Sequence, residues 1–337
     1  MNPVRINVVT ANSPAGGAVA IIQCHGDDAK QLLSQISGRD QWPLSRMQLT
    51  NLAGIDQGLA VLYRDDWAQL MPHGGQRVVG KLIDKLIDFG ARYESDIDAQ
   101  TIYPEAESEI EAEMLDTLWR AASPMAIDLL LDQPDRWRDP STHNAQTIRD
   151  HSAKLDRLIN PPTVVVVGQP NVGKSTLTNR MLGQSASVVA DLPGTTRDWV
   201  AGFAELSGGT AGVAVRWMDT PGIRNSNDEI EQAAIELAQN VISTADVLIA
   251  LRDPDADWHG DSSARSADLW LINKIDEPSK FDGDGADPDA PLPISAVHGH
   301  GIDRLEHLIL DRLELHDIDP TIPWAFSDAL RAELNAR

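Results

Sequence analysis

A glycine-rich loop that ends in a lysine and a serine carries the clearest chemistry in this sequence. Residues 168–175 read Gly-Gln-Pro-Asn-Val-Gly-Lys-Ser and follow the apolar run 163–167. Such a loop can wrap a phosphate, because its glycines turn tightly and its backbone N–H groups converge at the start of a helix. Lys174 is expected to reach the β- and γ-phosphate oxygens, and Ser175 is expected to ligate Mg²⁺. The predicted phosphate-binding residues are Gly168, Asn171, Val172, Gly173, Lys174, Ser175 and Thr176.

A second motif, Asn273-Lys274-Ile275-Asp276, closes the apolar run 269–272 and indicates which base is bound. The Asp276 carboxylate can accept from both the N1–H and the exocyclic amino group of guanine. Adenine has no N1–H in that position and would leave a buried acid unpaired. Ser295-Ala296 are expected to place a backbone N–H against the guanine O6. Together with the phosphate loop, the motif predicts binding of GTP and GDP.

Two segments between these motifs are expected to contact the γ-phosphate and its metal ion. Asp219 ends the strand-like run 213–218, where it can hold Mg²⁺ through a water, and Gly222 can donate its N–H to the γ-phosphate. Gly194-Thr195-Thr196-Arg197-Asp198 precedes another strand-like run, and Thr196 is the expected metal ligand there.

The order of these elements resembles the Ras-like GTPases related to translation factors, and most closely the tRNA-modification GTPase family called MnmE or TrmE. The likeness extends to the N-terminal part, where Ser13–Ile22, Asp56–Ala60 and His73-Gly74-Gly75 are similar to family segments. The resemblance implies GTP hydrolysis in tRNA wobble-uridine modification, with tRNA as a partner. The alternative is a nucleotide-controlled switch, such as a ribosome-assembly GTPase, without modification chemistry.

The resemblance also implies how GTP is hydrolysed. Ile223 stands where Ras-like proteins have the glutamine that orients water, and the family uses a glutamate in the next segment, which matches Glu231 here. The implied catalytic residues are Glu231, Lys174 and Thr196. Glu231 is alternatively a solvated acid near the start of a helix over 229–241, where the helix dipole favours it.

A potassium site is implied as well, because the family uses an asparagine at the position of Asn171 as a K⁺ ligand. The implied K⁺ ligands are Asn171, Ala190, Leu192 and Thr195. Such an ion can offset charge that develops on the leaving phosphate. Asn171 is alternatively a loop residue that tolerates left-handed geometry. A homodimer through the N-terminal module or the G domains is expected, and pairing of two G domains is expected to order the K⁺ site.

Departures from the family pattern concern folate and the C-terminus. The family holds a formylated tetrahydrofolate with an arginine and a glutamate where this chain has Gln23 and Gln69, and one lysine-bearing segment has no counterpart after Arg92. Losing these charges should cost on the order of several kcal/mol, so folate is not expected as a cofactor. The sequence ends at Arg337 without the family's Cys-x-Gly-Lys, so a modification partner is expected to supply the missing chemistry.

Composition favours a soluble cytoplasmic protein. The 337 residues, 42% of them hydrophobic, suffice for two domains with separate cores, and the single Cys24 excludes a disulfide framework. No signal peptide and no run of ~18 apolar residues is found, so no membrane partner is expected. The net charge of −23 argues against bulk binding of nucleic acid. A local basic surface is expected only if Lys81, Lys85 and Arg92 share a helix.

The predicted fold is a Ras-like α/β P-loop GTPase domain with an N-terminal α+β (folate-domain-like) module and a short helical segment. The predicted domains are 1–103 (α+β module), 104–160 (helical segment and linker), 161–316 (GTPase domain) and 317–337 (C-terminal tail). In the module, short strands are expected over 5–10, 18–24 and 58–63, and helices over 28–37 and 76–89. Later helices are expected over 105–131, interrupted at Ser123-Pro124, and over 144–158. Only 252–267 connect two strands that must run parallel, so a shortened crossover is expected there and in the next connection.

Overall fold

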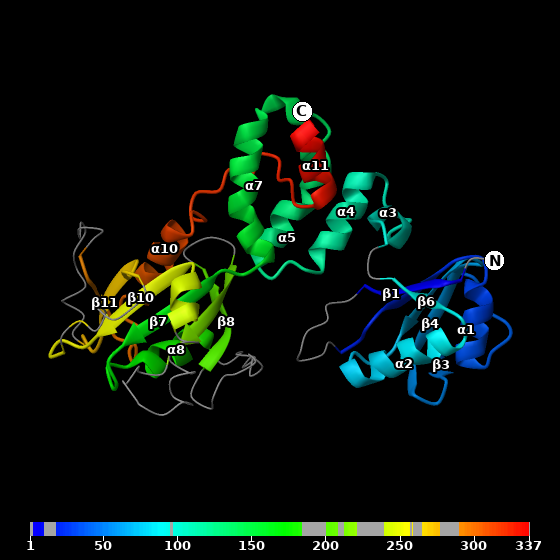
Figure 1. The fold of residues 1–337 in the computed structure, drawn as a ribbon, viewed down its shortest axis with the longest axis horizontal. Coiled ribbons are helices and arrows are strands. Elements are labelled where there is room, and N and C mark those ends of the chain that lie inside the picture. Colours follow the sequence, from blue (N-terminus) through cyan, green and yellow to red (C-terminus); the bar gives the residue numbers. More distant parts are fainter. Residues whose placement is uncertain are drawn as a thin grey trace. The chain divides into compact units, whose positions relative to one another are not determined.

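The structure is a computed structural model, and it describes residues 3–9, 18–94, 97–183, 200–207, 212–220, 239–256, 258, 265–276 and 290–336. The chain forms two compact units, Met1–Arg120 and Ala121–Arg337 (Figure 1). This division falls inside the predicted helical segment 104–160, between the helices Glu109–Leu118 and Pro124–Leu131. The three boundaries between the four predicted domains stay predictions.

The first unit contains a mixed sheet with the strand order β3-β4-β5-β2-β1-β6. Its strands are β1 (Arg5–Val8), β2 (Ile22–His25), β3 (Gln48–Leu52), β4 (Asp56–Arg64), β5 (Trp67–Met71) and β6 (Arg92–Tyr93). Its helices are α1 (Ala29–Ser37), α2 (Gln76–Asp88), α3 (Ala99–Ile102) and α4 (Glu109–Leu118). Strands β1 and β6 pair parallel, and the other pairs are antiparallel. The predicted α+β module is therefore present.

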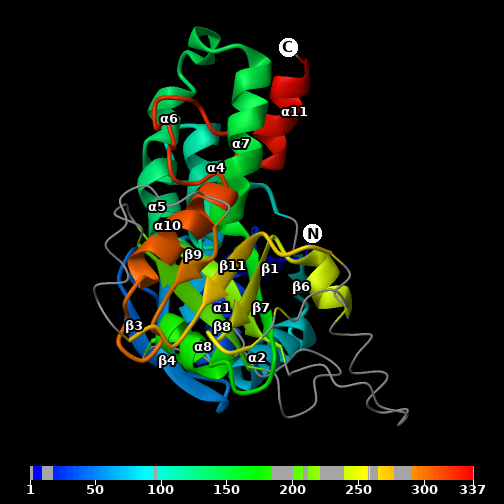
Figure 2. The same ribbon diagram turned by 90° about the vertical axis from the view of Figure 1, so that its left-hand side faces the viewer.

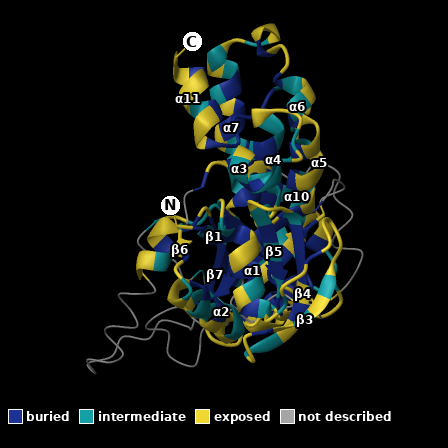
Figure 3. Cartoon of the chain, turned by 90° about the vertical axis from the view of Figure 1, so that its right-hand side faces the viewer, coloured by how far each residue is buried: buried dark blue, intermediate teal, exposed yellow. Residues whose placement is uncertain are grey.

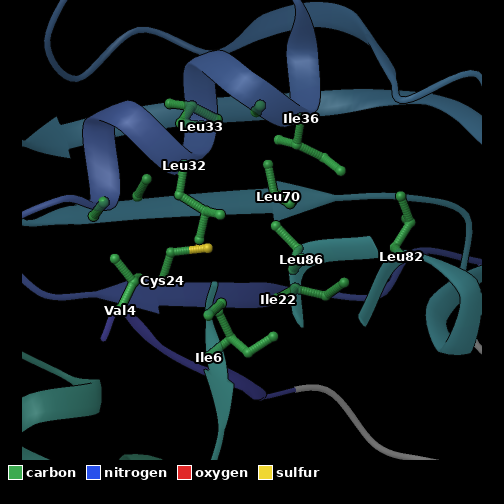
Figure 4. Close-up of a cluster of buried hydrophobic side chains, with 14 of the residues drawn as sticks. Val4, Ile6, Ile22, Cys24, Leu32, Leu33, Ile36, Leu70, Leu82 and Leu86 are labelled. Carbon is green, nitrogen blue, oxygen red and sulfur yellow. The ribbon is translucent and has the colours of Figure 1, made fainter. Parts of the chain in front are cut away.

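One face of this sheet forms the core with α1 and α2. Alternate residues of β2 and β5, among them Ile22, Cys24 and Leu70, lie on the face of the sheet that the helices cover. There they belong to one buried cluster with Leu33 of α1 and Leu86 of α2 (Figure 4). This follows from the two-residue period of a strand. Burial raises the pKa of the Cys24 thiol to about 12, which suits a structural residue and not a reactive one.

Three strands of the first unit were not predicted. β3 and β5 were missed because their sequences alternate weakly, and β6 has only two residues. The idea that three basic residues share a helix is wrong. Lys81 and Lys85 lie on α2, but Arg92 lies on β6, after the helix has ended.

The second unit contains a sheet with the order β12-β11-β10-β7-β9-β8. Its strands are β7 (Thr163–Gly168), β8 (Val200–Leu206), β9 (Val213–Asp219), β10 (Val247–Arg252), β11 (Leu269–Ile272) and β12 (Leu292–Pro293). Neighbours pair parallel except β8 and β9. The central strands β7 and β10 are buried on both faces, as their continuous apolar runs predict (Figure 3). The predicted α/β fold is confirmed.

Helix α8 (Lys174–Leu182) follows β7 and helix α10 (Ile302–Arg312) follows β12, and the described residues 239–244 just before β10 are helical as well. The described residues between the parallel strands β10 and β11 form turns and bends. Trp258 fills part of this connection, edge-on to Trp270, with the Arg252 guanidinium over its ring. The next connection, 277–289, lies outside the described residues.

The remaining helices of the second unit form a small bundle. They are α5 (Pro124–Leu131), α6 (Gln133–Arg136), the short 3₁₀ helix Pro140–Thr142, α7 (Ala145–Ile159) and α11 (Asp328–Ala336). α11 lies beside α7, where Arg331 pairs with Asp156 (Figure 2). Trp324 is fully buried, and its backbone N–H donates to Gln133. The C-terminal residues are thus part of the bundle.

Candidate functional site

The phosphate loop connects β7 to α8, and two of its glycines are required by close contacts. A Cβ at Gly168 would lie 2.2 Å from the Leu251 carbonyl oxygen, and a Cβ at Gly173 would lie 2.2 Å from Asn273 Nδ2. Gly173 also has a φ of 99°, which favours glycine. The loop therefore approaches its neighbours too closely for any side chain at these positions, and it ends at the N-terminus of α8, where N–H groups favour an anion.

Lys174 lies folded over this loop. Its Nζ donates to the carbonyl oxygens of Gly168 and Gln169, both at 3.0 Å. Burial lowers the pKa of Lys174, and the nearby Asp219 charge acts in the opposite direction. An ammonium group carries three donors, so these two bonds leave one that can serve a phosphate oxygen.

Ser175 and Asp219 form a pair of oxygen ligands at the ends of α8 and β9. Ser175 Oγ donates to Asp219 Oδ2 at 2.8 Å. Asp219 is 5% exposed, and its Oδ1 is buried with no hydrogen-bond partner among the described residues. Burial raises the pKa of Asp219, whereas the Ser175 hydrogen bond and the Lys174 charge lower it. A hydroxyl beside a carboxylate with a spare oxygen fits a hard divalent ion such as Mg²⁺.

The base motif is tied to the phosphate loop by Asn273. Its Nδ2 donates to the Val172 carbonyl oxygen at 2.9 Å, and its Oδ1 accepts from the Ala296 N–H at 2.9 Å. Ser295 Oγ donates to Asp276 Oδ1 at 2.7 Å. The structure therefore brings the predicted phosphate loop, Asn273–Asp276 and Ser295–Ala296 together at one edge of the sheet.

Several predicted site residues are not part of this assembly as described. Gly222, Glu231, Thr195, Thr196, Ala190 and Leu192 lie outside the described residues. Asn171 is described, exposed and left-handed with a φ of 66°. That backbone agrees with its reading as a loop residue, and its role as a K⁺ ligand stays a prediction.

Two contacts of this region were missed by the sequence analysis. Lys274 Nζ donates to Asp253 Oδ2 at 2.9 Å, and this hydrogen bond lowers the pKa of Asp253. Asp253 directly follows β10, and polar residues at the carboxyl ends of parallel strands are a usable signal. Arg180 of α8 donates to the Ala296 and Val297 carbonyl oxygens, a contact that no local pattern indicates.

Gln23 and Gln69 of the first unit, from which the sequence analysis argues against folate, are uncharged. Gln23 and Gln69 are cross-strand neighbours on β2 and β5. Gln23 is 2% exposed, its Nε2 donates to the Ile102 carbonyl oxygen at 3.1 Å, and its Oε1 lies 2.8 Å from His25 Nε2. Burial lowers the pKa of His25 to about 4, so this ring is neutral at pH 7. The amide is thus occupied by protein groups, and none of these residues supplies a charge for an anionic ligand.

A folate titration is therefore expected to show no saturable binding at micromolar ligand. Isothermal titration with 5-formyltetrahydrofolate measures this directly, because binding of an anion without a charged partner lacks the stronger, charge-assisted hydrogen bonds. Saturation at micromolar ligand would contradict the prediction. It would mean that other residues, first of all Arg92 and His73, have rebuilt the pocket.

None of the helices in the described parts of the chain combines the length and the apolarity that crossing a membrane requires.

Comparison with known proteins shows which proteins the chain is similar to. Residues 163–279 match the family described as 50S ribosome-binding GTPase. A tRNA modification GTPase MnmE of Nitrosomonas europaea is 27% identical, over 89% of this chain and 79% of its own length. The protein of that name from Thermosipho melanesiensis is 26% identical, over 91% and 81%. Among solved structures, Era of Aquifex aeolicus is 28% identical over 44% of this chain and 56% of its own, with a TM-score of 0.34. The chain is thus similar to the tRNA modification GTPases MnmE along most of its length, and residues 163–279 match a GTPase family.

Proposed function

We propose that this chain binds GTP with Mg²⁺ and hydrolyses it to GDP and phosphate as a step in tRNA wobble-uridine modification. The observation that carries the GTPase part is the shared edge at which β7, β9 and β11 end. These strands belong to one parallel set, so their carboxyl ends deliver the phosphate loop, Asp219 and Asn273–Asp276 to one place. The tRNA part is supported by the MnmE relatives that match along most of the chain.

In this proposal, the residues divide the work between phosphate, metal and base. The loop N–H groups and Lys174 hold the β- and γ-phosphates. Ser175 would ligate Mg²⁺ directly and Asp219 would hold it through a water, and the bound ion would neutralise charge on the phosphates. Asp276, fixed by Ser295, would read the guanine edge. Thr196 and Gly222 would complete the metal and γ-phosphate contacts.

We assign placement of the attacking water to Glu231. A K⁺ ion would offset the charge that develops on the leaving phosphate, and its ligands would be Asn171, Ala190, Leu192 and Thr195. Glu231 would act through one water as a general base. This assignment rests on the resemblance of Asn227–Glu231 to the family segment. It leads to a test that does not depend on nucleotide affinity.

Potassium is expected to accelerate GTP hydrolysis more than sodium does. Without an activating cation the rate should be near that of an unassisted Ras-like domain, roughly 10⁻⁴ to 10⁻³ s⁻¹. Glu231→Ala should remove most of the potassium-stimulated turnover and leave the GDP affinity within about a few-fold, because the side chain acts on water and not on the bound nucleotide. Phosphate release in matched KCl and NaCl buffers measures both effects.

Glu333→Ala is a matched control, since this glutamate lies on α11 and the change should leave the potassium response intact. Equal rates in the two salts, together with indifference to Glu231, would contradict the mechanism. A separate activating protein would then be the better explanation.

The dependence of the rate on protein concentration tests for a homodimer, and co-purification tests for an RNA or ribosomal partner. Pairing of two G domains would order the first switch, so the rate per chain should rise with protein concentration. Co-purification of tRNA would support the modification role, and co-purification of ribosomal particles would favour a ribosome-assembly switch. We favour the modification role because the similar proteins that span 89% and 91% of the chain are tRNA modification GTPases by name.

A further inference from the structure

We infer that Arg180 is a positioning residue for base recognition. From α8, it fixes the backbone of Ser295–Val297 so that the Val297 N–H faces the carbonyl oxygen of a bound guanine. The inference rests on the proposed GTP binding and adds a specificity-determining contact to it. Arg180 acts through the backbone and does not itself touch the nucleotide.

The contact of Arg180 is a two-point clamp. Its Nε donates to the Ala296 carbonyl oxygen, and its Nη2 donates to the Val297 carbonyl oxygen. A guanidinium is a planar fork with donors at fixed angles, so two bonds to successive carbonyls fix the orientation of both peptide groups. Gly299 makes room for this group, because a Cβ there would lie 2.8 Å from Arg180 Nη1.

On the opposite side of this segment, the N–H groups face the base motif. The Ala296 N–H donates to Asn273 Oδ1 at 2.9 Å. The His298 N–H donates to Ser295 Oγ at 3.2 Å, and that hydroxyl in turn donates to Asp276. The Ala296 and Val297 carbonyls therefore face Arg180 of α8, the Ala296 N–H faces Asn273, and the His298 N–H faces the Ser295 hydroxyl that bonds Asp276.

The Val297 N–H lies between these two bonded N–H groups. In a trans peptide the C=O and the N–H point in opposite directions, and the described residues contain no cis peptide. Because the Ala296 C=O points at Arg180, the Val297 N–H points away from α8. It has no hydrogen-bond partner among the described residues, and Val297 is 66% exposed.

The position of this donor matches the chemistry of guanine. The Asp276 carboxylate accepts from the N1–H and the amino group, and the carbonyl oxygen O6 is on the ring carbon next to N1. A donor beside Asp276 therefore meets O6, whereas adenine offers an amino group there, which would place a donor against a donor. Since the Ala296 N–H is engaged by Asn273, we assign the O6 contact to Val297.

The test compares GDP with 6-thio-GDP, which keeps the N1–H and amino group but has a weaker acceptor, sulfur, in place of O6. Isothermal titration of the full chain with each nucleotide gives two dissociation constants per variant. Arg180→Ala is expected to weaken the binding of GDP about tenfold and the binding of 6-thio-GDP by no more than about twofold. The reason is that a backbone that Arg180 no longer aligns loses the hydrogen bond to O6 above all. Arg180→Lys should behave like Arg180→Ala, since an ammonium keeps the charge but not the fork.

Arg304→Ala is the matched control, because Arg304 is an exposed arginine on α10 and its loss should change neither constant. An equal loss for both nucleotides, no loss for either, or full rescue by lysine would each overturn the role of Arg180. The melting temperature of each variant without nucleotide separates these outcomes from unfolding. If the unchanged chain binds neither GDP nor 6-thio-GDP, the proposed function itself fails, independently of Arg180.

Discussion

Replacing Lys174 by alanine is expected to abolish tight nucleotide binding, with a loss of at least about a hundredfold in affinity for both GDP and GTP. The ammonium group is already held over the loop by two carbonyl oxygens, so it needs little reorganisation to meet a phosphate. The loss of affinity should be the same for every base, because Lys174 contacts the phosphate loop and not Asp276. Fluorescence titration with a labelled GDP measures the effect.

A second variant separates binding from folding. Truncation of Lys174 removes its hydrogen bonds to the carbonyl oxygens of Gly168 and Gln169, at a cost of about 1 kcal/mol each. Lys174→Met keeps most of the side-chain volume and should lose binding to the same extent. Lys154→Ala removes an ammonium group that pairs with Glu314 on the helical side and should bind normally. Unchanged affinity in either Lys174 variant would refute the proposed role.

The part of the fold that could be predicted from sequence is the part whose pattern is local. The valines of β7 predict a buried parallel strand, and the glycine at position 183 marks the end of α8 with a φ of 63°. The helix α4 begins later than predicted because Ser108 caps it by accepting from the Glu111 N–H. A cap of this kind is visible in the sequence, but only once the helix boundary is known.

The strands that could not be predicted depend on partners distant in sequence. In β3, exposed and half-buried residues alternate, and the strand exists because β4 pairs with it along its whole length. β6 has two residues and pairs with β1, far away at the start of the chain. Their stability comes from hydrogen bonds to a neighbour and not from their own composition.

The candidate site shows the same division. The phosphate loop, Asp219 and Asn273–Asp276 form recognisable motifs because each needs particular residue types at fixed spacing. The Arg180 clamp joins residues 116 positions apart, and an arginine near the end of a helix is by itself ordinary. Such a contact follows only from the way α8 and the Ser295–Val297 segment pack.

Replacing Asp276 by asparagine is expected to change the base preference from guanine to xanthine. Xanthine has a carbonyl oxygen where guanine has its amino group. The protein must therefore donate a hydrogen bond to xanthine at the point where the Asp276 carboxylate accepts one from guanine. Asparagine supplies this donor through Nδ2, while its Oδ1 can still accept from Ser295, as the Asp276 Oδ1 does at 2.7 Å. The variant should bind GDP about a hundredfold more weakly and XDP more tightly than the unchanged chain does.

Competition titrations with GDP, XDP and ATP against a labelled nucleotide measure this preference. The unchanged chain should bind ATP at least about a hundredfold more weakly than GDP, because adenine leaves the Asp276 carboxylate without its N1–H partner. Asp317→Asn is a matched control, since its side chain is almost fully exposed and pairs only with His316 among the described residues. Equal affinities of the unchanged chain for GDP and ATP would refute guanine recognition by Asp276. A loss of GDP binding without a gain for XDP would show that the asparagine cannot turn its amide toward the base while Ser295 holds Oδ1.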